Sequence, residues 1–183
     1  MQNKSTAEKS NIILIGMPGA GKSTAGVILA KQSGLAFIDT DVLIQTQEGR
    51  PLQDIVDHDG YLSLRRIEEG VLLKLDLRNT VIATGGSAVY SDRAMTHLKQ
   101  RGLAVFLDVD LPTLKTRVRD YDTRGLARKP DQTVDDLFQE RFALYRKYAD
   151  ITIGCAGGVH EEVCARIRAA WKKHFADRTD ERI

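Results

Sequence analysis

The feature that most constrains this chain is the stretch from Asn11 to Thr24, which reads NIILIGMPGAGKST. A short apolar run suited to a buried strand leads into a glycine-rich turn, and helical spacing follows at residues 25–31. The turn fits the pattern G-x-x-x-x-G-K-S/T, in which backbone N–H groups and a helix N-terminus hold phosphate oxygens. Lys22 would reach the β- and γ-phosphates, and the Ser23 hydroxyl would ligate Mg²⁺. The residues expected to bind the nucleotide are Gly16, Gly19, Ala20, Gly21, Lys22, Ser23 and Thr24.

The rest of the chain alternates short apolar strands with helical patterns. Strands are expected at residues 12–15, 35–38, 80–84, 103–107 and 151–153. Such alternation predicts an α/β fold with right-handed crossovers and one parallel sheet covered on both faces. The long helix after the second strand is expected to run from Tyr61 to Leu77. We expect one domain over residues 11–176, with flexible tails at 1–10 and 177–183.

Composition narrows the class of protein. The chain has 183 residues, of which 42% are hydrophobic and 28% charged, as in ordinary globular proteins. No apolar run approaches the ~20 residues of a membrane span, and the first ten residues have no signal-peptide core. A formal net charge of +2 is too small to indicate a nucleic-acid or membrane surface. We therefore expect a cytoplasmic protein with two reduced structural cysteines and no nucleic-acid or membrane partner. We also expect a monomer, although composition does not bear on the oligomeric state.

A phosphate site of this kind needs a carboxylate to manage Mg²⁺, and two strand ends offer one. Asp108 follows the more hydrophobic strand, but Asp110 and the Leu111-Pro112 pair that come next are typical of a helix start. Asp39 is favoured because Asp41 lies two residues further on, and alternate strand residues point to the same side. Asp39 could then serve the metal while Asp41 accepts a hydroxyl proton. The alternative is that Asp41 only caps the next helix.

Five motifs together resemble the shikimate kinases. Besides the glycine-rich turn, they are the triplet at 39–41, GYLSLRRIE at 60–68, the glycine pair at 85–86 and ERFALY at 140–145, in the order and approximate spacing of that family. The resemblance implies a three-layer α/β/α P-loop kinase fold with a five-stranded parallel sheet. It also implies a LID segment at about 117–131 that covers ATP, and transfer of the γ-phosphoryl group of ATP to a hydroxyl of shikimate.

The resemblance assigns roles residue by residue. Arg124 would be the LID arginine that reaches the phosphates, and Arg119, or alternatively Arg117, would lie against adenine. Lys22, Asp41 and Arg124 would be catalytic, and Glu68 would support Arg65. Two arginines can clamp the carboxylate of a small triol acid by charge-assisted hydrogen bonds. The implied sets are Asp41, Arg65, Gly85, Gly86 and Arg141 for shikimate, and Ser23 and Asp39 for Mg²⁺.

The chain departs from the family pattern at several positions. The third glycine is Ser87, a Gly-Glu pair reads Gly60-Tyr61, and the phenylalanine before the first arginine is Leu64. The LID motif reads RGLA at 124–127 in place of RPLL, and a proline is replaced by Ala143. No departure removes a required charge, but Ser87 and Leu64 adjoin the expected acceptor pocket. A gluconate-like or quinate-like acceptor therefore stays an alternative, as does a slow nucleotide-dependent switch.

Overall fold

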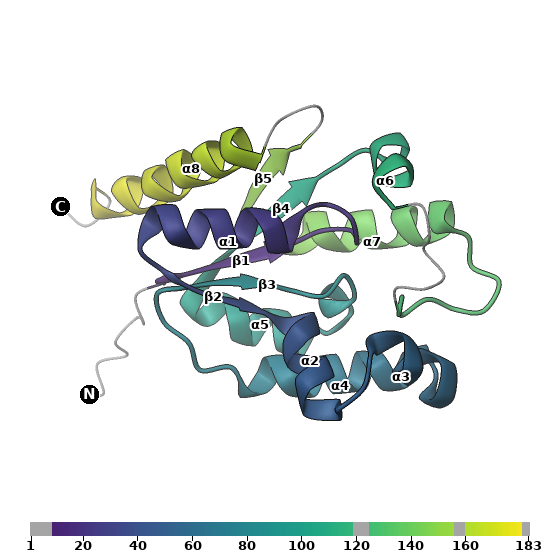
Figure 1. Ribbon diagram of the computed structural model, residues 1–183. Coiled ribbons are helices and arrows are strands. Elements are labelled where there is room, and N and C mark those ends of the chain that lie inside the picture. The colour runs from purple at the N-terminus through teal and green to yellow at the C-terminus, as the bar shows by residue number, and fades with distance from the viewer. Residues whose placement is uncertain (1–8, 119–124, 156–159, 181–183) are drawn as a thin grey trace.

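The computed structural model describes residues 9–118, 125–155 and 160–180, with side chains to residue 174. Five parallel strands form one sheet in the order β2-β3-β1-β4-β5 (Figure 1). The expected α/β fold with a five-stranded parallel sheet is confirmed. The strands are β1 (Asn11–Ile15), β2 (Ala36–Asp39), β3 (Thr80–Ala83), β4 (Gly102–Asp108) and β5 (Ile151–Gly154).

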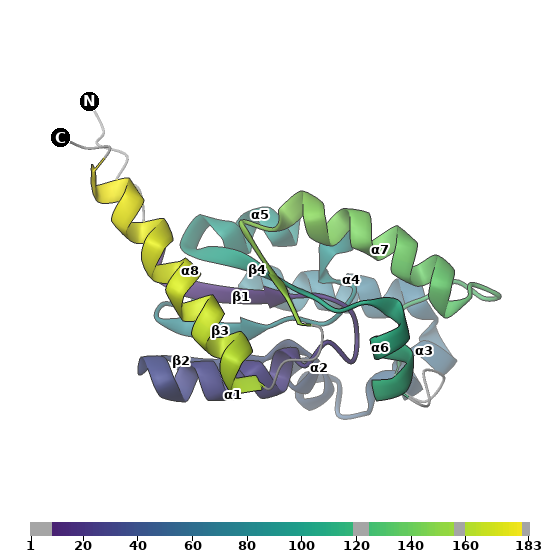
Figure 2. The same cartoon turned by 90° about the horizontal axis from the view of Figure 1, so that it is seen from above.

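Helices cover both faces of this sheet and one of its edges. Those described are α1 (Lys22–Ser33), α2 (Thr40–Glu48), α3 (Leu52–Asp59), α4 (Tyr61–Lys74), the 3₁₀ turn η1 (Ala88–Tyr90), α5 (Asp92–Arg101), α6 (Leu111–Arg117), α7 (Val134–Tyr148) and α8 (His160–Asp180). Helices α1 and α8 lie on one face of the sheet, and α5 and α7 lie on the other (Figure 2). Helices α2, α3 and α4 gather beside β2 (Figure 1). No helix within the described ranges is long and apolar enough to cross a membrane.

The central strand explains why the opening run has no polar alternation. All five residues of β1 are buried, with β3 and β4 paired on its two sides. A parallel strand covered on both faces buries every side chain, so an uninterrupted apolar run suits it. On the far side, the Phe106 ring of β4 stacks on Tyr145 of α7 at 5.2 Å between centroids. This packing fixes α7 against the sheet beside the carboxyl ends of the strands.

A second, smaller core holds the helices at the sheet edge together. It contains Ile44 of α2, Ile55 of α3, and Leu64 and Val71 of α4, together with Ala127 from the segment that follows the gap at 119–124. Ala127 is only 2% exposed. The end of the expected LID therefore packs onto these helices.

Two expected boundaries differ from the structure. Helix α4 ends at Lys74, three residues before the expected Leu77. The chain becomes extended at Leu75, which lets both Leu75 and Leu77 pack on the main core while the Leu77 carbonyl accepts from Asn11 Nδ2 at 2.7 Å. At the other end, α8 continues to Asp180, through the first four residues of the expected C-terminal tail.

Candidate active site

The glycine-rich turn joins β1 to α1 at the carboxyl edge of the sheet. Gly16, Gly19 and Gly21 have φ values of 147°, 85° and 88°, which L residues with side chains rarely adopt. A side chain at Gly19 would also collide with Val118. Gly21 caps α1 without a side-chain hydrogen bond, so the first N–H groups of α1 are left to a ligand. The local geometry therefore fits an anion site.

The Lys22 side chain curls back into this turn. Its Nζ donates to the carbonyl oxygens of Gly16 at 2.8 Å and Met17 at 3.0 Å. Burial lowers the pKa of Lys22 to about 8, and the nearby Asp41 charge acts in the opposite direction. The ammonium group is thus held at the floor of the turn by two neutral acceptors, which phosphate oxygens could replace.

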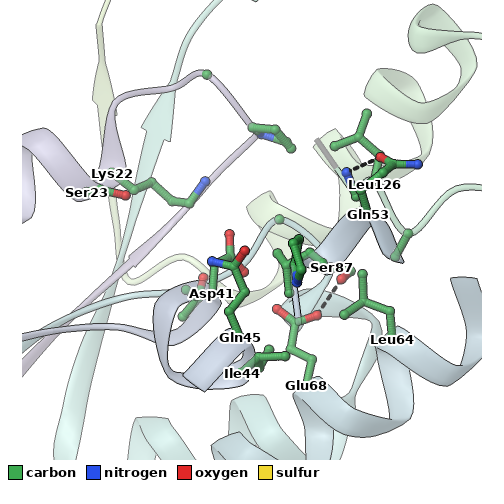
Figure 3. A pocket seen from close by; sticks show the side chains of 18 of the residues that line it. Lys22, Ser23, Asp41, Ile44, Gln45, Gln53, Leu64, Glu68, Ser87 and Leu126 are labelled. Atoms are coloured by element: carbon green, nitrogen blue, oxygen red, sulfur yellow. Dashed lines mark hydrogen bonds between the residues drawn. The ribbon is translucent and has the colours of Figure 1, made fainter. Parts of the chain in front are cut away.

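A cavity of about 630 Å³ opens beside the turn, bounded by α2, α3, α4 and α7 (Figure 3). Glu68, Ser87 and Gln53 also line it. It brings together many residues that the sequence assigned to two separate ligands. Assigned residues on its wall are Gly19, Gly21, Lys22, Ser23, Thr24, Asp41, Gly86, Arg117 and Arg141. Assigned residues that lie next to it without lining it are Gly16, Ala20, Asp39, Arg65 and Gly85.

Asp39 and Asp41 reach the site from different structural positions. Strand β2 ends at Asp39, whose Oδ1 accepts from the backbone N–H groups of Asp41 at 3.0 Å and Val42 at 3.3 Å. Asp39 is therefore the N-cap of α2, and Asp41 lies in its first turn. The expectation that both carboxylates leave one side of a strand is wrong, because the chain becomes helical at Thr40. The alternative that Asp41 caps the helix is also wrong, because Asp39 does so.

Asp39 also contacts the glycine-rich turn. Its second oxygen, Oδ2, accepts from the Ser23 hydroxyl at 2.5 Å. No hydrogen bond joins Asp108, the competing candidate, to Ser23 among the described residues, and Asp110 caps α6 by accepting from the N–H of Thr113 at 2.8 Å. The interpretation of the second strand end as a helix start is confirmed at Asp110.

The buried Glu68 and the half-buried Asp41 form a pair of carboxyl groups. A side chain on Gly85 would collide with both Asp41 Oδ1 and Glu68 Oε1, so the two oxygens lie against the same backbone. Burial raises the pKa of Asp41. Burial and the Asp41 charge raise the pKa of Glu68 to about 7. Glu68 Oε2 accepts from the Ser87 hydroxyl, while Oε1 has no hydrogen-bond partner among the described atoms.

The two assigned arginines converge on one atom. Arg65 of α4 and Arg141 of α7 each donate from Nη2 to the Ala127 carbonyl oxygen, both at 3.0 Å. Arg141 is 1% exposed, and its Nη1 lies so close to Gly86 that a side chain there would clash. The resemblance implied that Glu68 supports Arg65, but within the described ranges no hydrogen bond joins the two, and the hydrogen bond of Glu68 is with Ser87. The arginine pair instead holds a backbone carbonyl of the segment after the gap.

The expected LID is described only at its two ends. Arg117 lines the cavity, whereas Arg119 and Arg124 lie outside the described residues. Val118 and Leu126, on either side of the gap, pack together in a small cluster with Leu137.

Three residues of the site were missed in the sequence. Gln53 Oε1 accepts from the N–H of Gly125 at 2.6 Å, the Tyr90 ring lies beside both arginines, and His160 lines the cavity next to Gly21. Tyr90 follows the glycine pair closely in sequence, and this nearness was the available signal for it. Gln53 and His160 are far in sequence from every motif, so no local pattern marks them.

Known proteins provide an independent comparison. The family model described as shikimate kinase matches residues 18–172. A shikimate kinase from Persephonella marina is 34% identical over 163 residues, which cover 86% of this chain and 99% of that protein. One from Haemophilus influenzae is 37% identical over 151 residues, which cover 80% and 84%. The shikimate kinase from Acinetobacter baumannii in complex with shikimate has a TM-score of 0.84 and 31% identity over 94% of this chain and 98% of that one. The chain therefore belongs to the shikimate kinase family, whose members are ATP-dependent kinases.

Proposed function

We propose that this protein transfers the γ-phosphoryl group of ATP to the 3-hydroxyl of shikimate. The observation that carries the proposal is one cavity with the glycine-rich turn on one wall. On its other walls lie the half-buried Asp41 carboxylate and Arg141, which donates to the same carbonyl as Arg65. The turn would bind the phosphates of the donor, the carboxylate would bind the hydroxyl of the acceptor, and the arginines would bind its acid group. Family membership supports the same reaction.

In the donor half, the turn amides and the N-terminus of α1 would hold the phosphates. Lys22 would move from the carbonyls of Gly16 and Met17 to phosphate oxygens, where its charge offsets the charge that develops during transfer. Arg124 would reach the same phosphates and Arg119 the adenine; both stay predictions.

We assign Mg²⁺ to the side of the turn where Ser23 and Asp39 meet. A hydroxyl and a carboxylate oxygen in contact suit a hard cation that keeps waters and phosphate oxygens as its other ligands. The described residues hold no group of three or more His, Cys, Asp or Glu side chains, which agrees with a site that the nucleotide completes. When bound, the metal would neutralise phosphate charge.

In the acceptor half, Asp41 would act as the general base. It would take the proton of the 3-hydroxyl as that oxygen bonds to the γ-phosphorus, while the bond from phosphorus to the ADP oxygen breaks. Arg65 and Arg141 would bind the carboxylate in place of the Ala127 carbonyl. Gly85 and Gly86 would let the backbone approach the shikimate ring. A side chain at Gly85 would collide with Asp41 and Glu68, and one at Gly86 would collide with Arg141.

An ADP-release assay coupled to product analysis tests this function. Purified protein with ATP and Mg²⁺ is supplied with shikimate, quinate, gluconate or no acid. We expect ADP release that depends on shikimate, with a phosphomonoester at its 3-position. Faster turnover with gluconate or quinate would favour the alternative acceptors. ADP release that no acid accelerates would favour a nucleotide-dependent switch. Light scattering of the same sample tests the expected monomer.

A further inference from the structure

The guanidinium of Arg65 is held mainly through its flat faces. Its central carbon lies 3.5 Å from the centroid of the Tyr90 ring and 5.1 Å from that of Tyr61. Within the described part of the chain it forms no salt bridge, and its one hydrogen bond goes to the Ala127 carbonyl. Two aromatic rings thus support Arg65, which was expected to have a carboxylate partner.

This kind of support has a chemical advantage in a carboxylate site. A carboxylate beside Arg65 would use the same in-plane N–H donors that an acid ligand needs. An aromatic face attracts the cation through its quadrupole and leaves those donors unused. Arg65 can therefore be fixed in place and still present its fork to an anion.

Tyr90 also reaches the second arginine and is itself anchored. Arg141 lies 5.5 Å from the same ring centroid. The Tyr90 hydroxyl donates to Glu140 Oε1 at 2.6 Å, and Glu140 directly precedes Arg141 on α7. One side chain thus connects the arginine of α4 with the turn of α7 that carries the other arginine.

The anchor continues toward the segment that the arginines bind. Glu140 Oε2 accepts from Gln132 Nε2 at 2.8 Å, and Gln132 Oε1 accepts from the N–H of Lys129 at 3.2 Å. Lys129 lies two residues after Ala127, whose carbonyl receives both arginines. Tyr90 is thereby connected to the donors of the arginine pair and to the acceptor that they hold.

We infer that Tyr90 is a positioning residue for the acceptor carboxylate. Its ring aligns Arg65 with Arg141, and its hydroxyl fixes the ring to α7 through Glu140, so that both guanidiniums face one anion before it arrives. The inference rests on the proposed function, because it takes the acceptor to be an acid bound by these two arginines.

The test compares Tyr90→Leu and Tyr90→Met, which lack an aromatic face, with Tyr90→Phe, which keeps it. We measure KM for shikimate and for ATP, kcat, and the Kd of shikimate without nucleotide by calorimetry. Loss of a partly buried cation–π contact should raise the shikimate KM and Kd about 10-fold in the Leu and Met variants. KM for ATP and kcat should stay within about twofold, since the contact affects ground and transition states alike. Tyr90→Phe should recover most of the affinity, to within about threefold of wild type.

Tyr148→Leu is the control, because it removes a tyrosine whose ring contacts Lys147 and, among the described residues, neither Arg65 nor Arg141. It should leave the ratio of the two KM values unchanged. At least one of Tyr90→Leu and Tyr90→Met should fold. If the shikimate Kd of that variant is unchanged, or if its KM values for shikimate and ATP rise equally, the inference about Tyr90 is wrong while the proposed function stands. A wild-type protein that neither binds nor phosphorylates shikimate would overturn the proposed acceptor as well.

Discussion

The glycine-rich turn and the arginine side of the cavity are built in different ways. The turn is one continuous stretch whose ligand groups are backbone amides, a lysine and a hydroxyl within eight residues. The arginine side combines side chains from α2, α4, η1 and α7 with a carbonyl from the segment after the gap. Backbone geometry fixes the first, so few substitutions are tolerated there. Side-chain partners fix the second, and partners can be exchanged.

The largest expected effect is on the turn side. Lys22→Ala should lower kcat by about 10³-fold or more, because the charge that follows the γ-phosphoryl group is lost. The fold should persist, since Lys22 bonds only to carbonyls of its own turn. Steady-state assays with circular dichroism check both. Lys31→Ala, at the exposed end of the same helix, is the control. Wild-type turnover in Lys22→Ala would remove the turn from the reaction.

Asp41→Asn should lower kcat by about 10²-fold, because the amide keeps the shape and loses the proton acceptor. KM for ATP should change little. Asp54→Asn is the matched control and should keep the wild-type kcat, because Asp54 also lies in the first turn of a helix but is exposed. Rapid-quench measurement of the chemical step distinguishes this effect from slow product release. If both variants retain full rates, Asp41 is only a helix N-terminal acid.

On the arginine side, Arg65→Ala and Arg141→Ala should raise the shikimate KM by about 10- to 100-fold. KM for ATP should stay within about twofold, since the lost contact is uniform binding of the acceptor. Lysine at either position should rescue only partly, because a point charge lacks the planar fork. Arg146→Ala, exposed on α7, serves as the control. An equal loss of ATP affinity would place the arginines at the phosphates and erase the contrast between the two sides.

The smallest effect concerns stability and pH. The pKa of Glu68 is raised from 4.5 to about 7, so the folded state binds more protons than the unfolded state between these values. The contribution of Glu68 to stability should therefore be full below about pH 4.5 and be lost as pH rises to about 7, by on the order of 3 kcal/mol. Glu68→Gln removes the titration and can still accept from Ser87. Its Tm between pH 5 and 8 should vary less than that of wild type. Parallel curves for the two proteins would show that Glu68 is not the source.

Sequence reasoning worked where structure is local. The run at 12–15 predicted a strand with both faces covered, and β1 is completely buried. The motif that follows predicted a strand, turn and helix in the observed order. The strand boundaries were found to within one or two residues because apolar runs and glycines mark them. These predictions did not depend on contacts between residues far apart in the sequence.

Inference from the sequence failed where a residue's role depends on a contact with a residue distant in the sequence. Ser87 replaces a glycine and donates to Glu68, which lies 19 residues earlier and was expected to support Arg65. Gly125 replaces a proline and has φ +60° and an N–H that donates to Gln53, neither of which proline can supply. Asp41 reaches the cavity from a helix because the strand ends at Asp39. None of these pairings leaves a periodic trace in the sequence.

The Ala127 carbonyl has a consequence for selectivity. Both arginines already hold a neutral acceptor, so a ligand gains affinity from them only by forming stronger bonds than that carbonyl does. A carboxylate meets this condition, because its negative charge attracts both guanidiniums and its two oxygens can accept from both, whereas the carbonyl is neutral and has one oxygen. An uncharged sugar alcohol with the same hydroxyls would exchange one neutral acceptor for another and gain nothing. If the two arginines bind the acceptor as we propose, the Ala127 carbonyl competes with it for their donors, and this competition favours acids over neutral polyols.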